Sequence, residues 1–405
     1  MIEKTNKNEW PLFRMIIPAF PEINIFTRQA KKTTALGPIM VATVANKLWG
    51  WRVEVIDENN YRGPRDGRGL PDHAILQKQN SAQVVGFYCG LTSTMERVWE
   101  TARFYRQKKV TTIAGGWHAH YCSEETLKHD IDLVVHGDGE SSIRKILTSL
   151  KRGEPLNNIL GTSFLEDGQF QTNQPEFLEE PDLNGLPYSD FSLLKYARIK
   201  IYPIGRIRGC SMNCEFCGVK GTPRWASAQH LFDTVSWLVE TKKARHFFIV
   251  DDRSEQDLGR TVEFFSMIAR KYGNRLHFTV QARLESAKNT KLLEIMRDAG
   301  VRIVCIGYES PIDEDLRAMR KGFLSSQMLE WTKIWHSYIR WIHAMFIVGY
   351  PLKEKQDSIG AKEIIRRFKD FISRASPDTV QILLPGPGPG TDLRLRLEKE
   401  GRVFP

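Results

Sequence analysis

Three of the chain's six cysteines lie within eight residues of one another, in the segment RIRGCSMNCEFCGVKG (206–221). They are Cys210, Cys214 and Cys217, at spacings of four and three residues. Six cysteines in 405 residues are too few for a disulfide scaffold, so this clustering indicates a metal or redox site. The other cysteines are isolated, and we interpret them as small buried apolar residues. They are Cys89, Cys122 and Cys305.

The number of cysteines in the cluster distinguishes between kinds of metal site. A structural zinc ion takes four ligands, usually as two close pairs, and the chain has no second cysteine pair. The nearest histidine is His230, so a Cys3His zinc site remains an alternative. Three thiolates suit a 4Fe–4S cluster, because they leave one of the four irons open to a substrate or cofactor. We therefore expect Cys210, Cys214 and Cys217 to be metal ligands with a catalytic role.

The cysteine loop follows the first strand of a regular strand–helix alternation. The strands that we expect are 201–208, 246–251, 276–283, 302–309, 341–350 and 378–385. The helices that we expect between them lie near 227–243, 259–272, 289–299, 325–338 and 358–373. Six such units, with their loops on one face, predict a (β/α)6 partial TIM barrel over residues 201–405. The cysteines would then lie at the catalytic mouth of the barrel.

The first 150 residues predict a different α/β unit. We expect strands at 13–20, 51–57, 84–94, 110–116 and 131–140, and helices at 36–49, 95–107 and 123–128. This alternation is typical of a Rossmann-like, doubly wound parallel sheet, whose ligands lie at the carboxyl ends of the strands. Residues 151–200 contain several prolines, and we interpret them as a linker with one hairpin over 162–172, turning on Asp167-Gly168.

The cysteine spacing, with Phe216 before the last cysteine, resembles the motif of radical S-adenosylmethionine (radical SAM) enzymes. In that family the open iron chelates S-adenosylmethionine, and one electron from the cluster cleaves it to a 5′-deoxyadenosyl radical. The resemblance implies a 4Fe–4S cluster and S-adenosylmethionine as cofactors. It also implies a small-molecule substrate and a reductant such as flavodoxin or ferredoxin.

Polar groups and glycines at later strand ends fit the same family. The resemblance implies that Asp251 and Asp252 meet the amino group of S-adenosylmethionine, and that Arg283 meets its carboxylate. It places Glu309 and Ser310 near the ribose and carboxylate. It places Gly349 near the adenine.

The N-terminal unit resembles the cobalamin-binding domain that precedes the barrel in a large subgroup of these enzymes. The segments that carry the resemblance are 36–57, 84–94, 113–120 and 134–140. The D-x-H-x-x-G loop that supplies a histidine to cobalt in many such domains is absent, because no histidine precedes His73. The resemblance still implies cobalamin bound through hydroxyls and backbone of six residues, Thr92, Ser93, Thr94, Gly115, Gly116 and Gly137. We interpret His118 and His120 as hydrogen-bonded structural groups.

These observations predict an enzyme that uses cobalamin and radical chemistry to methylate or rearrange an unactivated carbon. Two alternatives stay open. One is a cobalamin-independent radical SAM cyclase, dehydratase or epimerase with a degenerate B12 domain. The other is a zinc-binding protein without enzymatic activity.

The composition limits the partners. The net charge is +10 and the pI is about 9.2, but no run of Lys and Arg exceeds two residues. We therefore do not expect nucleic-acid binding. No stretch is long and apolar enough for a membrane span, and the N-terminus MIEKTNKNEW does not resemble a targeting peptide, so we expect a cytoplasmic protein.

Overall fold

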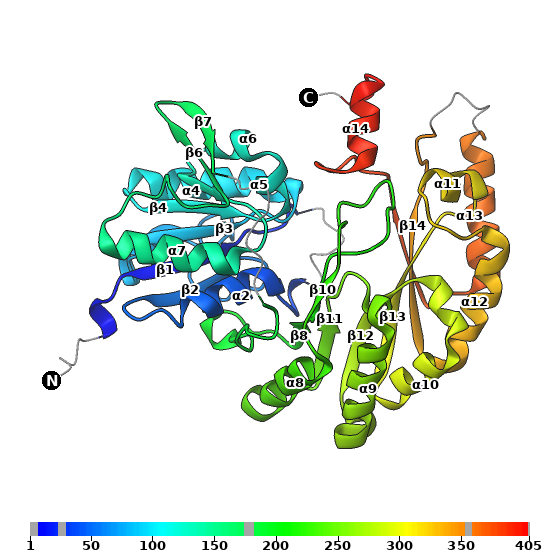
Figure 1. Cartoon of the computed structure of the whole chain (residues 1–405). Coiled ribbons are helices and arrows are strands. Elements are labelled where there is room, and N and C mark those ends of the chain that lie inside the picture. The colour runs from blue at the N-terminus through cyan, green and yellow to red at the C-terminus, as the bar shows by residue number, and fades with distance from the viewer. Residues whose placement is uncertain (1–6, 23–29, 174–181, 353–358, 404–405) are drawn as a thin grey trace. The chain divides into compact units, whose positions relative to one another are not determined.

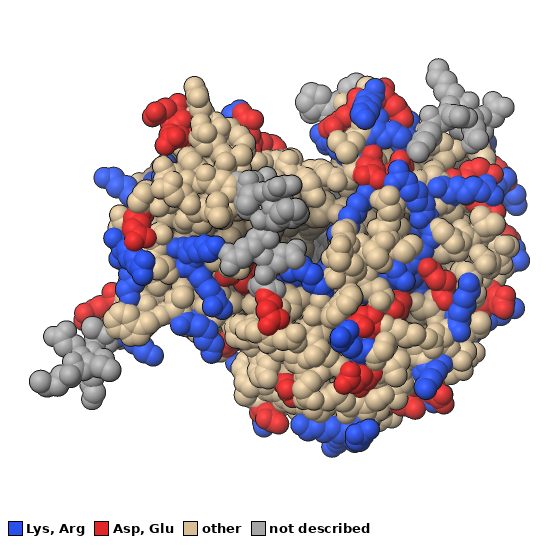
Figure 2. All heavy atoms as spheres, viewed as in Figure 1, with Lys and Arg blue, Asp and Glu red and all other residues tan. Residues whose placement is uncertain are grey.

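The computed structural model describes residues 7–22, 30–173, 182–352 and 359–403, and divides the chain into two compact units (Figure 1). The first unit comprises Met1–Lys200 and the second Ile201–Pro405. No helix within the described ranges is long and apolar enough to cross a membrane. On the face shown in Figure 2, basic side chains are interspersed with acidic ones.

The first unit is built on a seven-stranded sheet with the order β2-β1-β3-β4-β5-β6-β7. Its strands are β1 (Leu12–Ile17), β2 (Arg52–Asp57), β3 (Val84–Tyr88), β4 (Thr111–Gly115), β5 (Leu133–Val135), β6 (Thr162–Glu166) and β7 (Gln169–Thr172). The first five are parallel, as predicted, and the last two are antiparallel. The chain order reverses between β1 and β3, which creates the switch point where doubly wound sheets bind ligands.

Six α-helices accompany this sheet in the described residues. They are α2 (Leu36–Ala45), α3 (His73–Gln79), α4 (Met95–Gln107), α5 (Trp117–Tyr121), α6 (Ser123–Leu127) and α7 (Gly139–Arg152). Helices α2 and α7 lie side by side, whereas α4 packs against β4 (Figure 1). Helix α7 was not predicted, because we assigned residues up to 140 to a strand. Its buried residues Ile143, Ile146 and Leu147 recur at helical spacing, and Gly153 ends it in the left-handed conformation.

The predicted hairpin is present, but it extends the first sheet. Strands β6 and β7 turn on Asp167 and Gly168, which have φ angles of +50° and +78°. Two consecutive positive φ angles are the requirement of a two-residue type I′ turn. Strand β6 pairs with β5, so this part of residues 151–200 is structurally continuous with the first unit.

The second unit contains a six-stranded parallel sheet with the order β15-β14-β13-β12-β11-β8. These strands are β8 (Ile201–Ile204), β11 (His246–Ile249), β12 (His277–Ala282), β13 (Val301–Glu309), β14 (Trp341–Ile347) and β15 (Thr379–Leu383). The longer helices are α8 (Ala228–Lys242), α9 (Leu258–Tyr272), α10 (Thr290–Asp298), α12 (Ser325–Tyr338) and α13 (Ala361–Ala375), with α11 (Asp313–Ala318) and α14 (Asp392–Lys399) shorter. The long helices follow the outside of the curved sheet (Figure 1). The predicted partial barrel is therefore confirmed, although residue 358, where we began its last long helix, lies outside the described residues.

A glycine ends helix α10 at the turn into β13. Gly300 has a φ angle of +90°, and a Cβ atom there would lie 2.1 Å from the Leu276 carbonyl oxygen. We expect Gly300→Ala to lower the free energy of unfolding by at least roughly 2 kcal/mol, because both the backbone conformation and the contact oppose a side chain. Chemical denaturation of the two proteins measures the change.

Gly259 provides the matched control. It lies in the first turn of α9, has no strained φ angle, and a Cβ atom there would meet nothing within 4 Å. Gly259→Ala should be neutral or stabilising by up to about 1 kcal/mol. Equal losses in both variants would contradict the role given to Gly300.

Candidate functional site

The cysteine loop lies at the mouth of the barrel. It joins two short antiparallel strands, β9 (Ile207–Arg208) and β10 (Arg224–Trp225), and has no regular secondary structure of its own. The loop begins at Gly209, whose φ angle of +87° favours glycine. The chain therefore leaves β9 through a turn directly before Cys210.

The three thiols differ in accessibility. Cys214 is buried, whereas Cys210 and Cys217 are partly exposed. Ligands of one tetrahedral zinc ion would lie roughly 3.8 Å apart, given a Zn–S distance of about 2.3 Å. Within the described residues, these three Sγ atoms do not all lie within 4.8 Å of one another. Thiolates that bind different irons of one cluster are not held so closely.

The surroundings of the thiols favour a bound cation. Burial raises the pKa of Cys217, and the neighbouring Cys214, Cys210 and Asp252 raise it further by charge repulsion. A nearby positive charge would therefore favour the Cys217 thiolate. The donor set fits an iron–sulfur cluster, whose irons supply that charge.

Two aspartates after β11 hold the start of the loop. The Asp251 carboxylate accepts hydrogen bonds from the backbone N–H groups of Arg206 (2.6 Å) and Ile207 (2.9 Å). The Asp252 carboxylate accepts one from the Gly209 N–H at 3.0 Å. Asp251 is only 2% exposed, whereas Asp252 is exposed. Asp252 is therefore the one of the pair whose carboxylate can also meet a ligand.

Arg283 connects three strand ends at the barrel mouth. Its guanidinium lies 3.9 Å from the Cys214 Sγ atom and also donates to the Lys321 carbonyl and the Glu285 carboxylate. The Lys321 ammonium in turn donates to the Glu309 carboxylate at 3.0 Å, and both side chains are largely buried. The structure thus brings together the cysteine loop, the end of β12 and the end of β13.

Glu309 occupies a strained position. Its φ angle is +62°, the Ser310 N–H donates to the Tyr308 carbonyl at 2.9 Å, and the pairing with β14 shifts register here. Strain of this kind persists where the surrounding structure enforces it, often at functional sites. A Cβ atom on Gly307 would lie 2.3 Å from the Glu309 carboxylate, so that glycine makes room for it.

The other two predicted residues of the barrel differ in accessibility. Ser310 is fully buried, and its hydroxyl donates to the Asp315 carboxylate at 2.7 Å. Gly349 is exposed, with a φ angle of +74° and open space where a Cβ atom would lie. Ser310 is therefore committed to the protein, whereas Gly349 offers its backbone to a ligand.

Two carboxylate oxygens beside Arg283 lack partners. Within the described residues, Glu255 Oε2 and Glu285 Oε2 are buried and accept no hydrogen bond. The other oxygen of Glu255 accepts from the Arg283 backbone N–H at 3.0 Å. Buried carboxylate oxygens are normally satisfied, so these two are suited to a ligand that carries N–H or O–H donors.

A residue inside the cysteine motif fastens the loop to the end of the chain. The Glu215 carboxylate, 1% exposed, accepts from Arg396 on α14 (Nε, 2.9 Å; Nη2, 3.2 Å) and from the Tyr350 hydroxyl (2.8 Å). Phe216 packs against the Tyr350 ring. Neither Glu215 nor Arg396 was predicted to take part in the site, although the acidic residue between Cys214 and Phe216 is visible in the sequence.

In the first unit, the residues predicted to meet cobalamin lie at the carboxyl ends of β3, β4 and β5. Thr92 and Ser93 are exposed, whereas the buried Thr94 hydroxyl donates to the Leu91 carbonyl at 2.8 Å. Thr92 and Ser93 are therefore accessible to a ligand, although the Thr92 hydroxyl also lies 3.1 Å from His118 Nδ1, whereas the Thr94 hydroxyl is buried.

The glycines of this edge differ from one another. Gly116 has a φ angle of +117°, and a Cβ atom there would lie 2.9 Å from the Cys89 carbonyl carbon, so only glycine allows this approach of two strand ends. Gly137 also has a positive φ angle, of +65°, whereas Gly115 has ordinary space around it. As expected, His120 is hydrogen-bonded within the protein. Its Nδ1 atom lies 3.0 Å from the Nδ1 atom of His136.

Comparisons with known proteins agree with both units. Residues 28–147 match the B12 binding domain family, and residues 204–359 match the Radical SAM superfamily. An uncharacterized methyltransferase of Pyrococcus horikoshii is 25% identical over 320 residues, which are 75% of this chain and 67% of that protein. The hopanoid C-3 methylase of Methylococcus capsulatus is 24% identical over 308 residues, which are 70% of this chain and 58% of the methylase.

Among solved structures, the fold is similar to TsrM of Kitasatospora setae, a radical S-adenosylmethionine methyltransferase with cobalamin and a 4Fe–4S cluster bound. The TM-score is 0.77 at 16% identity, covering 96% of this chain and 78% of that one. At that identity the likeness concerns the fold. The chain spans about two thirds or less of the length of the two curated relatives.

The contact between Glu215 and Arg396 can be tested on α14. We expect Arg396→Leu to lower the free energy of unfolding by roughly 3 kcal/mol, because it leaves a buried carboxylate with one fewer cationic partner. Arg394→Leu, on the same helix, removes only an exposed pair with Glu398 and should change it by less than about 0.5 kcal/mol. Chemical denaturation of the iron-free proteins compares the two. Similar effects would show that Arg396 does not stabilise the loop.

The buried Asp251 predicts a pH dependence. Burial raises its pKa from 3.8 to about 6, although backbone hydrogen bonds from Ile207 and Arg206 act against this shift. Between pH 4 and 6 the folded chain holds a proton that the unfolded chain has lost, so the stability of the parent falls as the pH rises through this window.

The variant Asp251→Asn has an amide in place of the carboxyl group, so this position no longer gains or loses a proton between pH 4 and 6. Its free energy of unfolding, relative to that of the parent, should therefore increase by up to roughly 3 kcal/mol from pH 4 to pH 6 and stay constant above. Urea denaturation at several pH values measures this difference. A difference that does not vary with pH would contradict the assignment of a raised pKa to Asp251.

Proposed function

The chain is a radical SAM enzyme with an N-terminal B12-binding domain, and we propose that it methylates an unactivated carbon of a small molecule. The observation that carries the proposal is the cysteine loop, with three thiols at the mouth of a partial barrel whose chain also contains a B12-binding domain. When bound, the 4Fe–4S cluster and S-adenosylmethionine supply one-electron cleavage of a C–S bond, and cobalamin supplies a methyl carrier.

In this proposal Cys210, Cys214 and Cys217 hold the cluster and leave one iron to S-adenosylmethionine. The Arg283 guanidinium beside Cys214 provides positive charge for a thiolate and, through its planar fork, for the cofactor carboxylate. The free oxygens of Glu255 and Glu285 accept hydrogen bonds from the cofactor's ammonium group.

Other residues at the barrel mouth bind and orient the cofactor. Asp252 and the Glu309–Lys321 pair provide polar contacts to the ammonium and ribose, and the exposed backbone at Gly349 meets the adenine. Asp251 and Ser310 act indirectly, because their side chains hold the loop and the turn after β13. This assignment divides the predicted residues into those that face the ligand and those that position others.

In the first unit, we assign cobalamin to the carboxyl edge of the sheet. Thr92 and Ser93 offer hydroxyl groups there, and Gly116 and Gly137 let the backbone approach a bulky ligand closely. The absence of a D-x-H-x-x-G histidine in the sequence means that this ligand would bind without a protein imidazole from that motif.

Methyl transfer is favoured by the relatives. The two curated proteins described above are named as a methyltransferase and a methylase, and the similar structure is that of a methyltransferase. A reductant such as flavodoxin or ferredoxin would supply the electron.

Reconstitution tests the proposal. The full chain is reconstituted anaerobically with iron, sulfide and hydroxocobalamin, then reduced and given S-adenosylmethionine with a deuterated methyl group and a small-molecule extract. We expect a bound corrin absorption band, 5′-deoxyadenosine and transfer of the label to a product, followed by mass spectrometry. Cleavage of S-adenosylmethionine without bound corrin would instead establish cobalamin-independent chemistry and overturn the methylation.

The cluster ligands are tested by Cys214→Ala. It should abolish cluster assembly and 5′-deoxyadenosine formation, because two thiolates do not retain the cluster, while the first unit stays folded. Iron content and circular dichroism measure these effects. Cys305→Ala, which changes a cysteine within β13, is the matched control and should keep its iron. If Cys214→Ala cleaves S-adenosylmethionine at the parent rate, the site is misassigned.

A further inference from the structure

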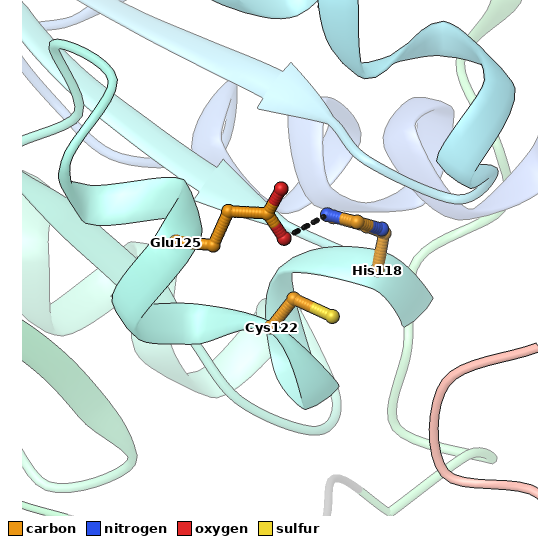
Figure 3. A group of neighbouring side chains, drawn as sticks. All are labelled: His118, Cys122 and Glu125. Atoms are coloured by element: carbon orange, nitrogen blue, oxygen red, sulfur yellow. Dashed lines mark ion pairs between the residues drawn. The ribbon is translucent and has the colours of Figure 1, made fainter. Parts of the chain in front are cut away.

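A second group of metal-binding side chains lies in the first unit (Figure 3). It consists of His118, Cys122 and Glu125, whose ligand atoms all lie within 4.8 Å of one another. No other group of three such residues in the described ranges is as close. The three residues are four and three positions apart, so they share one side of the corner between α5 and α6.

The imidazole of His118 is oriented as in a metal ligand. Its Nδ1 atom lies 3.1 Å from the Thr92 hydroxyl, a contact that fixes the ring and leaves Nε2 toward the other two side chains. His118 is 3% exposed, and burial lowers its pKa, so the ring is neutral at pH 7. A neutral imidazole with a free Nε2 lone pair is the form that binds metals.

Nothing in the described structure satisfies that nitrogen. Nε2 is buried and makes no hydrogen bond, and its nearest acidic atom is a Glu125 oxygen at 3.6 Å. An unsatisfied buried nitrogen is unfavourable by about 1–3 kcal/mol. Because Nε2 is buried, the broad corrin ring cannot reach it through its cobalt. A single small ion between the three side chains can.

The donor set selects among ions. A thiolate, an imidazole and a carboxylate together are typical of zinc, whereas magnesium and calcium require oxygen ligands. The Glu125 side chain is 48% exposed, so an ion can enter from its side and a water molecule can complete a tetrahedron.

We propose that His118 Nε2, Cys122 Sγ and a Glu125 oxygen bind one zinc ion. This site would correct our interpretation of Cys122 as an ordinary buried apolar residue and of His118 as only a hydrogen-bonded group. It is separate from the cysteine loop of the second unit and does not depend on the proposed radical chemistry. Through His118, the ion would also fix Thr92 at the end of β3, where we place cobalamin.

The test uses a full-length variant in which Cys210, Cys214 and Cys217 are all replaced by serine. This background removes the thiols that could take up zinc in place of iron. The protein is incubated with zinc, dialysed against metal-free buffer and analysed by mass spectrometry for zinc per chain. We expect about one zinc per chain.

X-ray absorption at the zinc edge then identifies the ligands. We expect one sulfur at about 2.3 Å and nitrogen and oxygen atoms at about 2.0–2.2 Å. Adding Cys122→Ser or His118→Gln should lower the zinc content at least tenfold, while circular dichroism reports whether the variants remain folded. Glu125→Gln should weaken binding, and Glu124→Gln, which changes a neighbouring exposed residue paired with Lys128, should not.

Three results would overturn the proposal. They are a zinc-free background protein, zinc that survives Cys122→Ser, and an absorption spectrum without a sulfur ligand. Because the background variant lacks the cluster cysteines, none of these results bears on the radical SAM assignment. Conversely, failure of the reconstituted enzyme to cleave S-adenosylmethionine would leave the zinc measurement intact.

Discussion

The strands of a parallel sheet all run in the same direction, so their carboxyl ends lie at the same edge. Each connection must therefore cross back over the sheet to start the next strand. The sheet of the second unit and the first five strands of the first unit are arranged in this way. The constraint explains why residues far apart in sequence, such as Cys214, Arg283 and Glu309, meet at one mouth. It also explains why the hydroxyls after β3 and the glycines after β4 and β5 share an edge. The chemistry of each unit is therefore located by its backbone pairing, before any side chain is considered.

The cysteine loop is held by side chains on other segments, because it has no backbone ladder of its own. Asp251 and Asp252 take the backbone N–H groups at its start, and Glu215 ties its middle to Tyr350 and Arg396. Each carboxylate satisfies polar groups that would otherwise be left unpaired near the barrel mouth. An irregular loop can direct three thiols toward one cluster.

Much of the fold could be predicted from the sequence, because strand–helix alternation is a local pattern. All six barrel strands begin within one residue of where the pattern placed them, although residues 207–208 of the predicted first strand belong to a separate two-stranded sheet. What could not be predicted depends on partners that are distant in sequence. The pattern gave no sign that Arg14, inside β1, would be fully buried against Glu54 and Tyr105. The sequence likewise gave no sign that the Asp251 carboxylate would accept hydrogen bonds from the backbone N–H groups of Arg206 and Ile207.

The contact between Glu215 and Arg396 spans 181 residues, and this separation has a consequence for biosynthesis. A ribosome adds about 5–20 residues per second, so Arg396 is made roughly 10–40 seconds after Glu215. During that interval the cysteines exist without the helix that fastens their loop. Iron–sulfur delivery to a nascent chain would meet an open loop, and delivery after release would meet a fastened one. The loop is therefore unfastened during one part of translation and can be fastened only once α14 has been made.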